Sequence, residues 1–202
     1  MKVIDCLCNL PTKEAIIDQI VGLPPQMSDY LRRVYGPRVA PLLGLTPGEL
    51  AQAKEEMGEE ELYRFLEPRV EPLAQSEEQF MAMLDSWGVE VAVLYNMDEE
   101  TVAGVRGLSN DYFAEVVSRH PERLRCFAGI DPHKGMDAVR EVERCVKELG
   151  LHGLAMRPFM QGIPADHRKF YPIYAKCVEL GVPVWLHQSV SFASLPMFVE
   201  HP

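Results

Sequence analysis

Polar side chains stand at the ends of short apolar segments of this sequence, and the most conspicuous of them is a histidine. His187 ends the apolar run VPVWLH, residues 182–187. An imidazole changes its charge near neutral pH and is a common metal ligand, so His187 is a candidate for proton transfer or metal binding. A structural histidine, held by hydrogen bonds at a strand end, is the alternative, and the residues alone leave both open.

Arg157 is the second candidate, because the segment AMRPF again places a polar group directly after apolar residues. A guanidinium is planar and holds a carboxylate through two parallel hydrogen bonds. One interpretation of Arg157 is therefore a clamp on a substrate carboxylate, and a structural ion pair is the equal alternative. Asn9 ends the first apolar run in the same way.

The other conspicuous residues are interpreted as structural. His133, in the loop DPHKG, fits the entry to a helix. Cys6 and Cys8 alternate with Leu7, which puts both cysteines on one face of a strand, and we expect them to pack beneath a helix. The sequence contains no Ser-His-Asp pattern, glycine-rich phosphate loop or zinc-type cysteine pairing.

The elements that must position these groups alternate regularly. Apolar runs typical of strands buried on both faces are separated by amphipathic helices. The predicted strands are residues 2–8, 89–96, 124–131, 151–158 and 182–188. The predicted helices are residues 76–88, 109–120, 137–150 and 168–181. In the second half the strands start about 30 residues apart, the period of parallel βαβ units, whose reactive face lies at the C-terminal strand ends.

A long insertion separates the first predicted strand from the second. Residues 12–74 contain helical pieces punctuated by proline and glycine, and we interpret them as a helical excursion. Five βα units, with residues 191–202 as the start of a sixth, are too few to close an eight-stranded barrel. The α/β fold is either an open doubly wound sheet or a TIM-barrel-like (β/α)8 fold that is incomplete in this chain.

Composition bounds the class of protein and its partners. Hydrophobic residues at 47% and charged residues at 25% are ordinary for a globular protein, and no apolar stretch of about 18 residues is present to cross a membrane. The N-terminus lacks the pattern of a signal peptide, so a cytoplasmic location is expected. The net charge of −10 would repel a phosphate backbone, which argues against a nucleic-acid partner. The five scattered cysteines are expected to be reduced.

The order of several segments resembles the amidohydrolase-related family of metal-dependent barrel enzymes. This family includes aminocarboxymuconate-semialdehyde decarboxylase and related aromatic-acid decarboxylases and hydrolases. The segments that carry the resemblance are VIDCLCNLP, SNDYFAEVVSRHPERLRCFAGIDP, AVREVERCVKELGLHGLAMRP, FYPIYAKCVELGVPVWLHQS and LPMFVEHP. The resemblance implies one barrel domain over residues 1–202, with 12–74 as an insertion.

The resemblance also implies one divalent, zinc-like metal at the mouth of the barrel, where it acts as a Lewis acid. The family's first strand ends in a His-x-His pair, but Leu7 and Asn9 stand at these positions here. His187 matches a later metal-binding histidine, and the family's remaining histidine and aspartate would follow Pro202. Zinc needs three or four protein ligands, so His187 alone would not hold it.

Three functions follow as hypotheses. The first is a metal-dependent hydrolase or non-oxidative decarboxylase that acts on a small carboxylated substrate. His187 would be its metal ligand or acid–base group, Arg157 its carboxylate clamp, and Asn9 a hydrogen-bonding remnant of the first-strand pair. The second is a catalytically degenerate binding or interaction subunit, either a homo-oligomer or completed as a barrel by a partner. The third is an unrelated small α/β protein.

Overall fold

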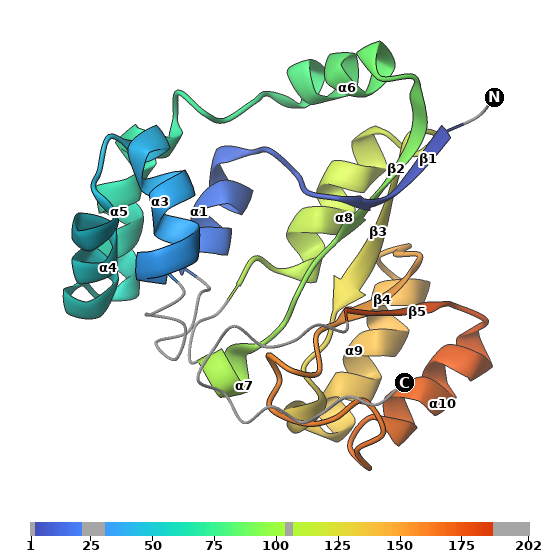
Figure 1. Ribbon diagram of the computed structural model, residues 1–202. Coiled ribbons are helices and arrows are strands. Elements are labelled where there is room, and N and C mark those ends of the chain that lie inside the picture. Colours follow the sequence, from blue (N-terminus) through green and yellow to red (C-terminus); the bar gives the residue numbers. More distant parts are fainter. Residues whose placement is uncertain (1–2, 22–30, 104–106, 188–202) are drawn as a thin grey trace.

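A parallel five-stranded sheet forms the centre of the computed structural model, which describes residues 3–21, 31–103 and 107–187 (Figure 1). The strands are hydrogen-bonded in the order β1-β2-β3-β4-β5, and every neighbouring pair is parallel. The strands are β1 (Val3–Cys8), β2 (Val89–Tyr95), β3 (Leu124–Gly129), β4 (Gly153–Met156) and β5 (Val184–Leu186). All five predicted strands are confirmed, each within a few residues of its expected bounds.

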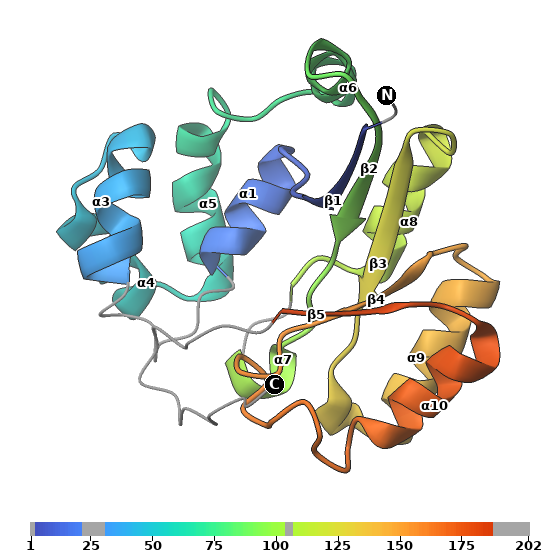
Figure 2. The same ribbon diagram turned by 45° about the vertical axis from the view of Figure 1, so that its right-hand side comes forward.

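This strand order distinguishes between the two predicted architectures. A doubly wound sheet reverses its strand order at a switch point, so that helices cover both faces. Strands that follow one another in sequence place every crossover on the same face, as in a (β/α)8 barrel. Figure 2 shows this sheet curling, with α8, α9 and α10 along its outer side. The fold is therefore a barrel that is incomplete in this chain; the predicted sixth unit, residues 191–202, lies outside the described part.

Four helices follow the predicted βα alternation, and their ends show why they form. They are α6 (Glu77–Ser86), α8 (Asn110–Arg119), α9 (Met136–Lys147) and α10 (Tyr171–Leu180). Before α6, Ser76 and Gln79 form a capping box: each side chain accepts the other residue's backbone N–H, at 3.2 and 2.8 Å. After α10, Gly181 adopts φ 69°, a left-handed conformation that ends a helix and favours glycine.

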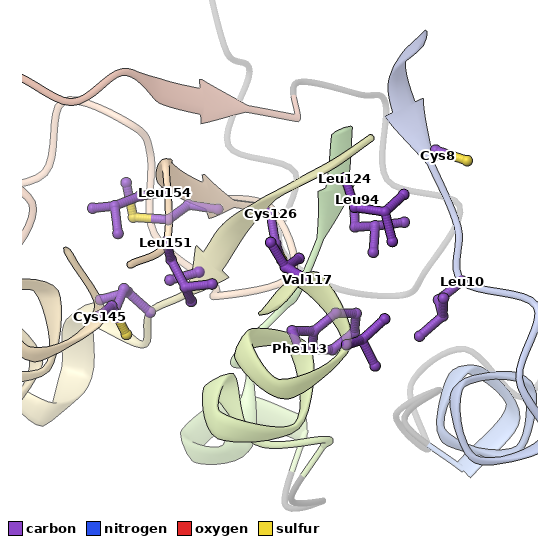
Figure 3. Close-up of a cluster of buried hydrophobic side chains, with 14 of the residues drawn as sticks. Cys8, Leu10, Leu94, Phe113, Val117, Leu124, Cys126, Cys145, Leu151 and Leu154 are labelled. Atoms are coloured by element: carbon purple, nitrogen blue, oxygen red, sulfur yellow. The ribbon is translucent and has the colours of Figure 1, made fainter. Parts of the chain in front are cut away.

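The main hydrophobic core lies between the sheet and these helices. Along most of β2 and β3, burial alternates between successive residues, and those that face the helices are almost completely buried. In Figure 3, Leu94, Leu124 and Cys126 of the sheet gather above Phe113 and Val117 of α8. Because helices cover this face of the sheet, polar side chains with a functional role must lie on the other face or at the ends of the strands.

The first strand differs from its prediction in one respect. Cys8 is buried in the main core as expected, but Cys6 is exposed. The register between β1 and β2 shifts between Asp5 and Cys8, so regular alternation is interrupted there. β1 is also an edge strand of the described sheet, with β2 as its one neighbouring strand there. The prediction that both cysteines pack beneath a helix is therefore wrong for Cys6.

The predicted helical excursion is confirmed, and it has a hydrophobic cluster of its own. It comprises α1 (Lys13–Val21), a π-helical turn (Leu31–Tyr35), α3 (Gly36–Val39), a 3₁₀ turn (Ala40–Leu43), α4 (Pro47–Glu56) and α5 (Glu59–Val70). Ile17, Leu50 and Leu66 are fully buried between these helices. The Lys54 ammonium donates hydrogen bonds at 2.7 Å to the carbonyls of Ile20 and Val21, which satisfies the C-terminal end of α1.

Asp18 of α1 links this helical insertion to the barrel. Its carboxylate accepts the backbone N–H of Leu108, in the loop before α8, and burial raises the pKa of Asp18 to about 6. A carboxyl whose pKa is raised by folding contributes stability that is complete below the unfolded pKa of about 4 and is lost as the pH rises through about 6. Ionised Asp18 therefore costs stability at neutral pH.

Asp18→Asn is accordingly expected to stabilise the protein at pH 8 by about 1–2 kcal/mol and to have little effect at pH 4. The asparagine carbonyl still accepts the Leu108 N–H, while the buried charge is removed. Urea unfolding at both pH values measures this difference, with Glu122→Gln, an exposed residue, as control. If Asp18→Asn were instead less stable than the parent at pH 8, the ionised Asp18 carboxylate would make attractive interactions that outweigh the cost of its burial.

Candidate functional site

The C-terminal ends of the strands bring the predicted site residues to one edge of the sheet. The face of the sheet turned away from the helices is called the open face here. Its side chains are partly buried, in contrast to the sealed opposite face, and they are Val91, Val93, Tyr95, Phe127 and Trp185. In a parallel barrel this face and edge form the reactive side.

Aromatic rings surround His187 at this edge. The His187 ring lies 5.4 Å from that of Trp185 and 5.7 Å from that of Phe159, measured between ring centroids. Trp185 in turn lies 5.2 Å from Tyr95 of β2. These distances are typical of packed aromatic pairs. Sequence reasoning did not single out Trp185 or Phe159, although alternation along β5 already places Trp185 and His187 on one face.

Tyr95 connects this aromatic group to the other two predicted positions. A side-chain hydrogen bond joins Tyr95 to Asn9, which follows β1. Burial raises the pKa of Tyr95, while the charge of Arg157 and the Asn9 bond act in the opposite direction. Arg157 also lies close enough to affect His187 electrostatically. The structure therefore brings Asn9, Arg157 and His187, predicted from three separate strands, to one place.

The electrostatics of this place favour a neutral imidazole. Burial lowers the pKa of His187, and the positive charge of Arg157 lowers it further. The backbone N–H of His187 donates to the carbonyl of Met156 at 2.9 Å, which extends the β4–β5 pairing and fixes the start of the side chain. A neutral histidine has one ring nitrogen free to accept a proton or to bind a metal.

Arg157 forms an ion pair with a carboxylate that the sequence analysis missed. Its Nε donates to Oε1 of Glu99 at 2.6 Å. The Glu99 side chain is only 7% exposed, and burial raises its pKa while Arg157 acts to lower it. Glu99 stands in the acidic stretch MDEE, which in a sequence is indistinguishable from a solvated loop. Arg157 thus forms the structural ion pair that the sequence analysis named as the alternative, and it does so through its Nε.

A complete metal site is not formed by the part of the chain that the structure describes. No three His, Cys, Asp or Glu side chains are grouped there as metal ligands would be. Leu7, which the sequence resemblance aligns with a family metal histidine, is 51% exposed and has no ligand atom. Asn9 is bonded to Tyr95 instead. The described residues therefore do not fit a zinc-like ion without further ligands.

His133 is structural, in agreement with its interpretation from the sequence. It lies in a 3₁₀ turn (Pro132–Lys134) that enters α9, and its backbone N–H donates to the Asp131 carboxylate at 2.8 Å. Its Nε2 lies 2.6 Å from the carbonyl of Gln161, and its Nδ1 lies 2.8 Å from the Lys169 ammonium.

A cavity of about 320 Å³ opens at the strand ends, beside the start of α8 and α9. Asn110, Asp111, Glu141 and Arg144 are among its lining residues. Both Nη atoms of Arg144 bond the Asp111 carboxylate, at 2.9 and 2.7 Å, and its Nε bonds Glu141 at 2.7 Å. Asn110 is held by four hydrogen bonds. The polar groups of these four residues are thus bonded to one another or to the barrel, and we interpret them as structural.

The fold and this arrangement define a parallel β/α barrel with a candidate site at its C-terminal edge. Residues 4–202 match the family model described as amidohydrolase. The chain belongs to the amidohydrolase family, which confirms the resemblance found in the sequence.

Two curated relatives show the kind of protein that this chain is similar to. Gamma-resorcylate decarboxylase of Polaromonas sp. is 29% identical over 130 residues, which make up 57% of this chain and 40% of that protein. The 2-keto-4-carboxy-3-hexenedioate hydratase of Sphingobium sp. is 39% identical over 90 residues, or 41% of this chain and 26% of that protein. The matched regions thus span less than half of either relative.

Solved structures confirm the fold. The 5-carboxyvanillate decarboxylase of Novosphingobium aromaticivorans superimposes with a TM-score of 0.58 at 21% identity. The match covers 94% of this chain and 51% of that one, whose crystals contain manganese and 4-hydroxy-3-methoxy-5-nitrobenzoic acid. The corresponding enzyme of Sphingomonas paucimobilis gives a TM-score of 0.57 at 18% identity, with 96% and 53% covered. Within residues 3–21, 31–103 and 107–187, no helix has the length and apolar character needed to span a membrane.

Proposed function

We propose that this chain supplies part of an amidohydrolase-type enzyme that removes a carboxyl group from, or hydrolyses, a small aromatic carboxylate. The observation that carries the proposal is the convergence of a guanidinium, an imidazole and three aromatic rings from three separate segments. Aromatic side chains bind a planar ring by stacking, and a guanidinium binds its carboxylate. The decarboxylases among the relatives act on molecules of this kind, as their names state.

In this proposal each predicted residue has one role. Arg157 holds a substrate carboxylate through the guanidinium nitrogens that Glu99 does not bond. His187, neutral at physiological pH, accepts or delivers the proton that such a reaction moves. Asn9 positions the Tyr95 hydroxyl. A divalent metal, as in the manganese-containing neighbours, would need ligands in addition to His187, and the roles of Arg157, Asn9 and Tyr95 do not depend on it.

A second function is favoured by one observation, the exposed Leu7 at a family metal position. A relative without its first-strand ligands could bind an aromatic carboxylate without transforming it. In either case the strands β1 and β5 end the described sheet with one neighbour each, and unpaired strand edges are sites of further pairing. We propose that a second copy or a barrel-completing partner covers them.

The test is an assay of the purified protein with gamma-resorcylate and 5-carboxyvanillate, together with its metal content. Release of carbon dioxide supports the enzyme, whereas binding without release supports the binding subunit. If turnover occurs, His187→Gln is expected to lower kcat by about 100-fold or more, because proton transfer by a positioned group is worth that much.

Arg157→Gln is expected mainly to raise KM in the same assay, because the lost carboxylate bond is formed in the ground state as well. Arg168→Gln serves as the control, since Arg168 is exposed. Absence of both turnover and binding for these two acids would refute the proposed substrate class.

A further inference from the structure

The ion pair between Glu99 and Arg157 differs from the surface ion pairs of this protein in its burial. The Glu99 side chain is 7% exposed, while that of Arg157 is 31% exposed. A buried carboxylate is costly unless it is paired and hydrogen-bonded, so this pair is held in a defined geometry. An exposed pair such as Arg119 with Glu115, at 43% and 73%, has no such constraint.

The backbone that carries Glu99 is fixed on both sides. Gln161, which is 1% exposed, donates from Nε2 to the carbonyl of Asp98 at 3.0 Å and to that of Ile130 at 2.7 Å. The N–H of Thr101 donates to the Asp131 carboxylate at 3.0 Å. The segment from 98 to 101 is therefore tied to the end of β3, and the Glu99 carboxylate has little freedom to move.

The bond to Glu99 uses only one of the five N–H donors of the guanidinium. Glu99 binds at Nε, and within residues 3–21, 31–103 and 107–187 no other residue forms a hydrogen bond or ion pair with the two terminal nitrogens. A planar guanidinium that is pinned at Nε presents its terminal nitrogens in a fixed direction, which suits bidentate carboxylate binding. The charge of Arg157 acts on His187 and Tyr95, which belong to the aromatic group, and also on Asp18 of α1.

We propose that Glu99 is a positioning residue, which holds Arg157 so that its terminal nitrogens face the aromatic group and receive a substrate carboxylate. The inference rests on the proposed function, because it assigns Arg157 to carboxylate binding. Glu99 lies in the loop after β2, outside the aromatic group, and the affinity for the carboxylate would depend on it. The rival role for Glu99 is that of an internal anion that competes with the substrate for Arg157.

The two roles predict opposite effects on the binding of benzoate, the simplest aromatic carboxylate. The probe is the fluorescence of Trp185 in a Trp87→Phe background, because the protein has two tryptophans and Trp87 is 63% exposed. If Glu99 positions Arg157, Glu99→Ala weakens benzoate binding by about three- to tenfold, the cost of ordering one long side chain. Glu99→Gln retains an oxygen that accepts the Nε proton and remains within about threefold of the parent.

The controls separate this inference from general damage. Glu122→Ala removes an exposed carboxylate at the opposite end of β3 and should leave benzoate binding unchanged. Thermal unfolding of each variant shows whether it is folded at the assay temperature. Tighter benzoate binding by Glu99→Ala than by the parent would overturn the proposal and assign Glu99 as a competing anion.

A second measurement keeps the inference testable if the parent does not bind benzoate, an outcome that counts against the proposed function alone. The Nε–Hε group of Arg157 gives a distinct NMR signal, assigned by its loss in Arg157→Lys. A pinned guanidinium protects this proton from exchange with water. The signal is expected in the parent and in Glu99→Gln and should broaden or vanish in Glu99→Ala. An unchanged signal in Glu99→Ala would refute the positioning role.

Discussion

Asn110→Leu is expected to lower the free energy of unfolding by about 4 kcal/mol, because the asparagine joins three elements through buried hydrogen bonds. Its Oδ1 accepts the N–H of Gly129 at 3.0 Å and the Nδ2 of Asn96 at 2.9 Å. Its Nδ2 donates to the carbonyl of Gly129 at 3.1 Å and to Glu141 at 2.9 Å. Leucine has a similar volume but leaves these partners without their bonds.

The cost of each unsatisfied buried group is roughly 1–3 kcal/mol, and several groups are affected at once. Urea denaturation at pH 7 measures the loss. Gln19→Leu makes a comparable change at an exposed position of α1 and should alter stability by less than about 0.5 kcal/mol. A loss below about 1 kcal/mol for Asn110→Leu would show that water replaces the bonds and that Asn110 is not a buried junction.

Gly129→Ala is expected to cost about 3 kcal/mol or more in unfolding free energy, for a steric reason. A Cβ on Gly129, at the end of β3, would lie 2.6 Å from the carbonyl carbon of Met97 and 2.8 Å from the backbone nitrogen of Asp98. Real Cβ atoms do not approach backbone atoms so closely, so the chain at 97–98 must move. That segment leads directly to Glu99.

The effect of Gly129→Ala should therefore reach the candidate site as well as stability. We expect weaker benzoate binding together with the lower free energy of unfolding, both measured on the same preparation. Gly48→Ala is the matched control, because a Cβ there meets only the Thr46 hydroxyl, at 3.9 Å. Gly48 lies in the first turn of α4, where alanine is neutral or stabilising by up to about 1 kcal/mol. Equal stability of Gly129→Ala and Gly48→Ala would mean that residues 97–98 can move away from the new Cβ without loss of stability.

The strands and main helices could be predicted because each element has a local physical signal. The segment Cys126-Phe127-Ala128 within β3 is an apolar run, and the capping box of Ser76 and Gln79 indicates where α6 begins. The prediction failed for Cys6, since the register shift in β1 depends on how the strand pairs with β2. Burial at a sheet edge is decided by neighbours that are distant in sequence.

The candidate site was predictable in part. Asn9, Arg157 and His187 stand out as polar residues at strand ends, and the parallel architecture requires that such ends meet. Glu99 and Phe159 carry no comparable signal, because they lie in loops whose paths depend on the packing around them. A carboxylate in an acidic loop becomes a buried partner of Arg157 only when Gln161 and Asp131 hold that loop against β3.

The sequence by itself therefore determined the family, the five strands and the three polar residues at strand ends, Asn9, Arg157 and His187. Periodicity and terminal signals act over a few residues, so they are readable without a structure. The tertiary structure alone decided that the sheet curls as a barrel, that Glu99 holds Arg157, and that His187 packs against Phe159. Glu99 and Arg157 are 58 residues apart in the chain, and Phe159 and His187 lie before and after α10, so these contacts arise from packing that no local pattern encodes.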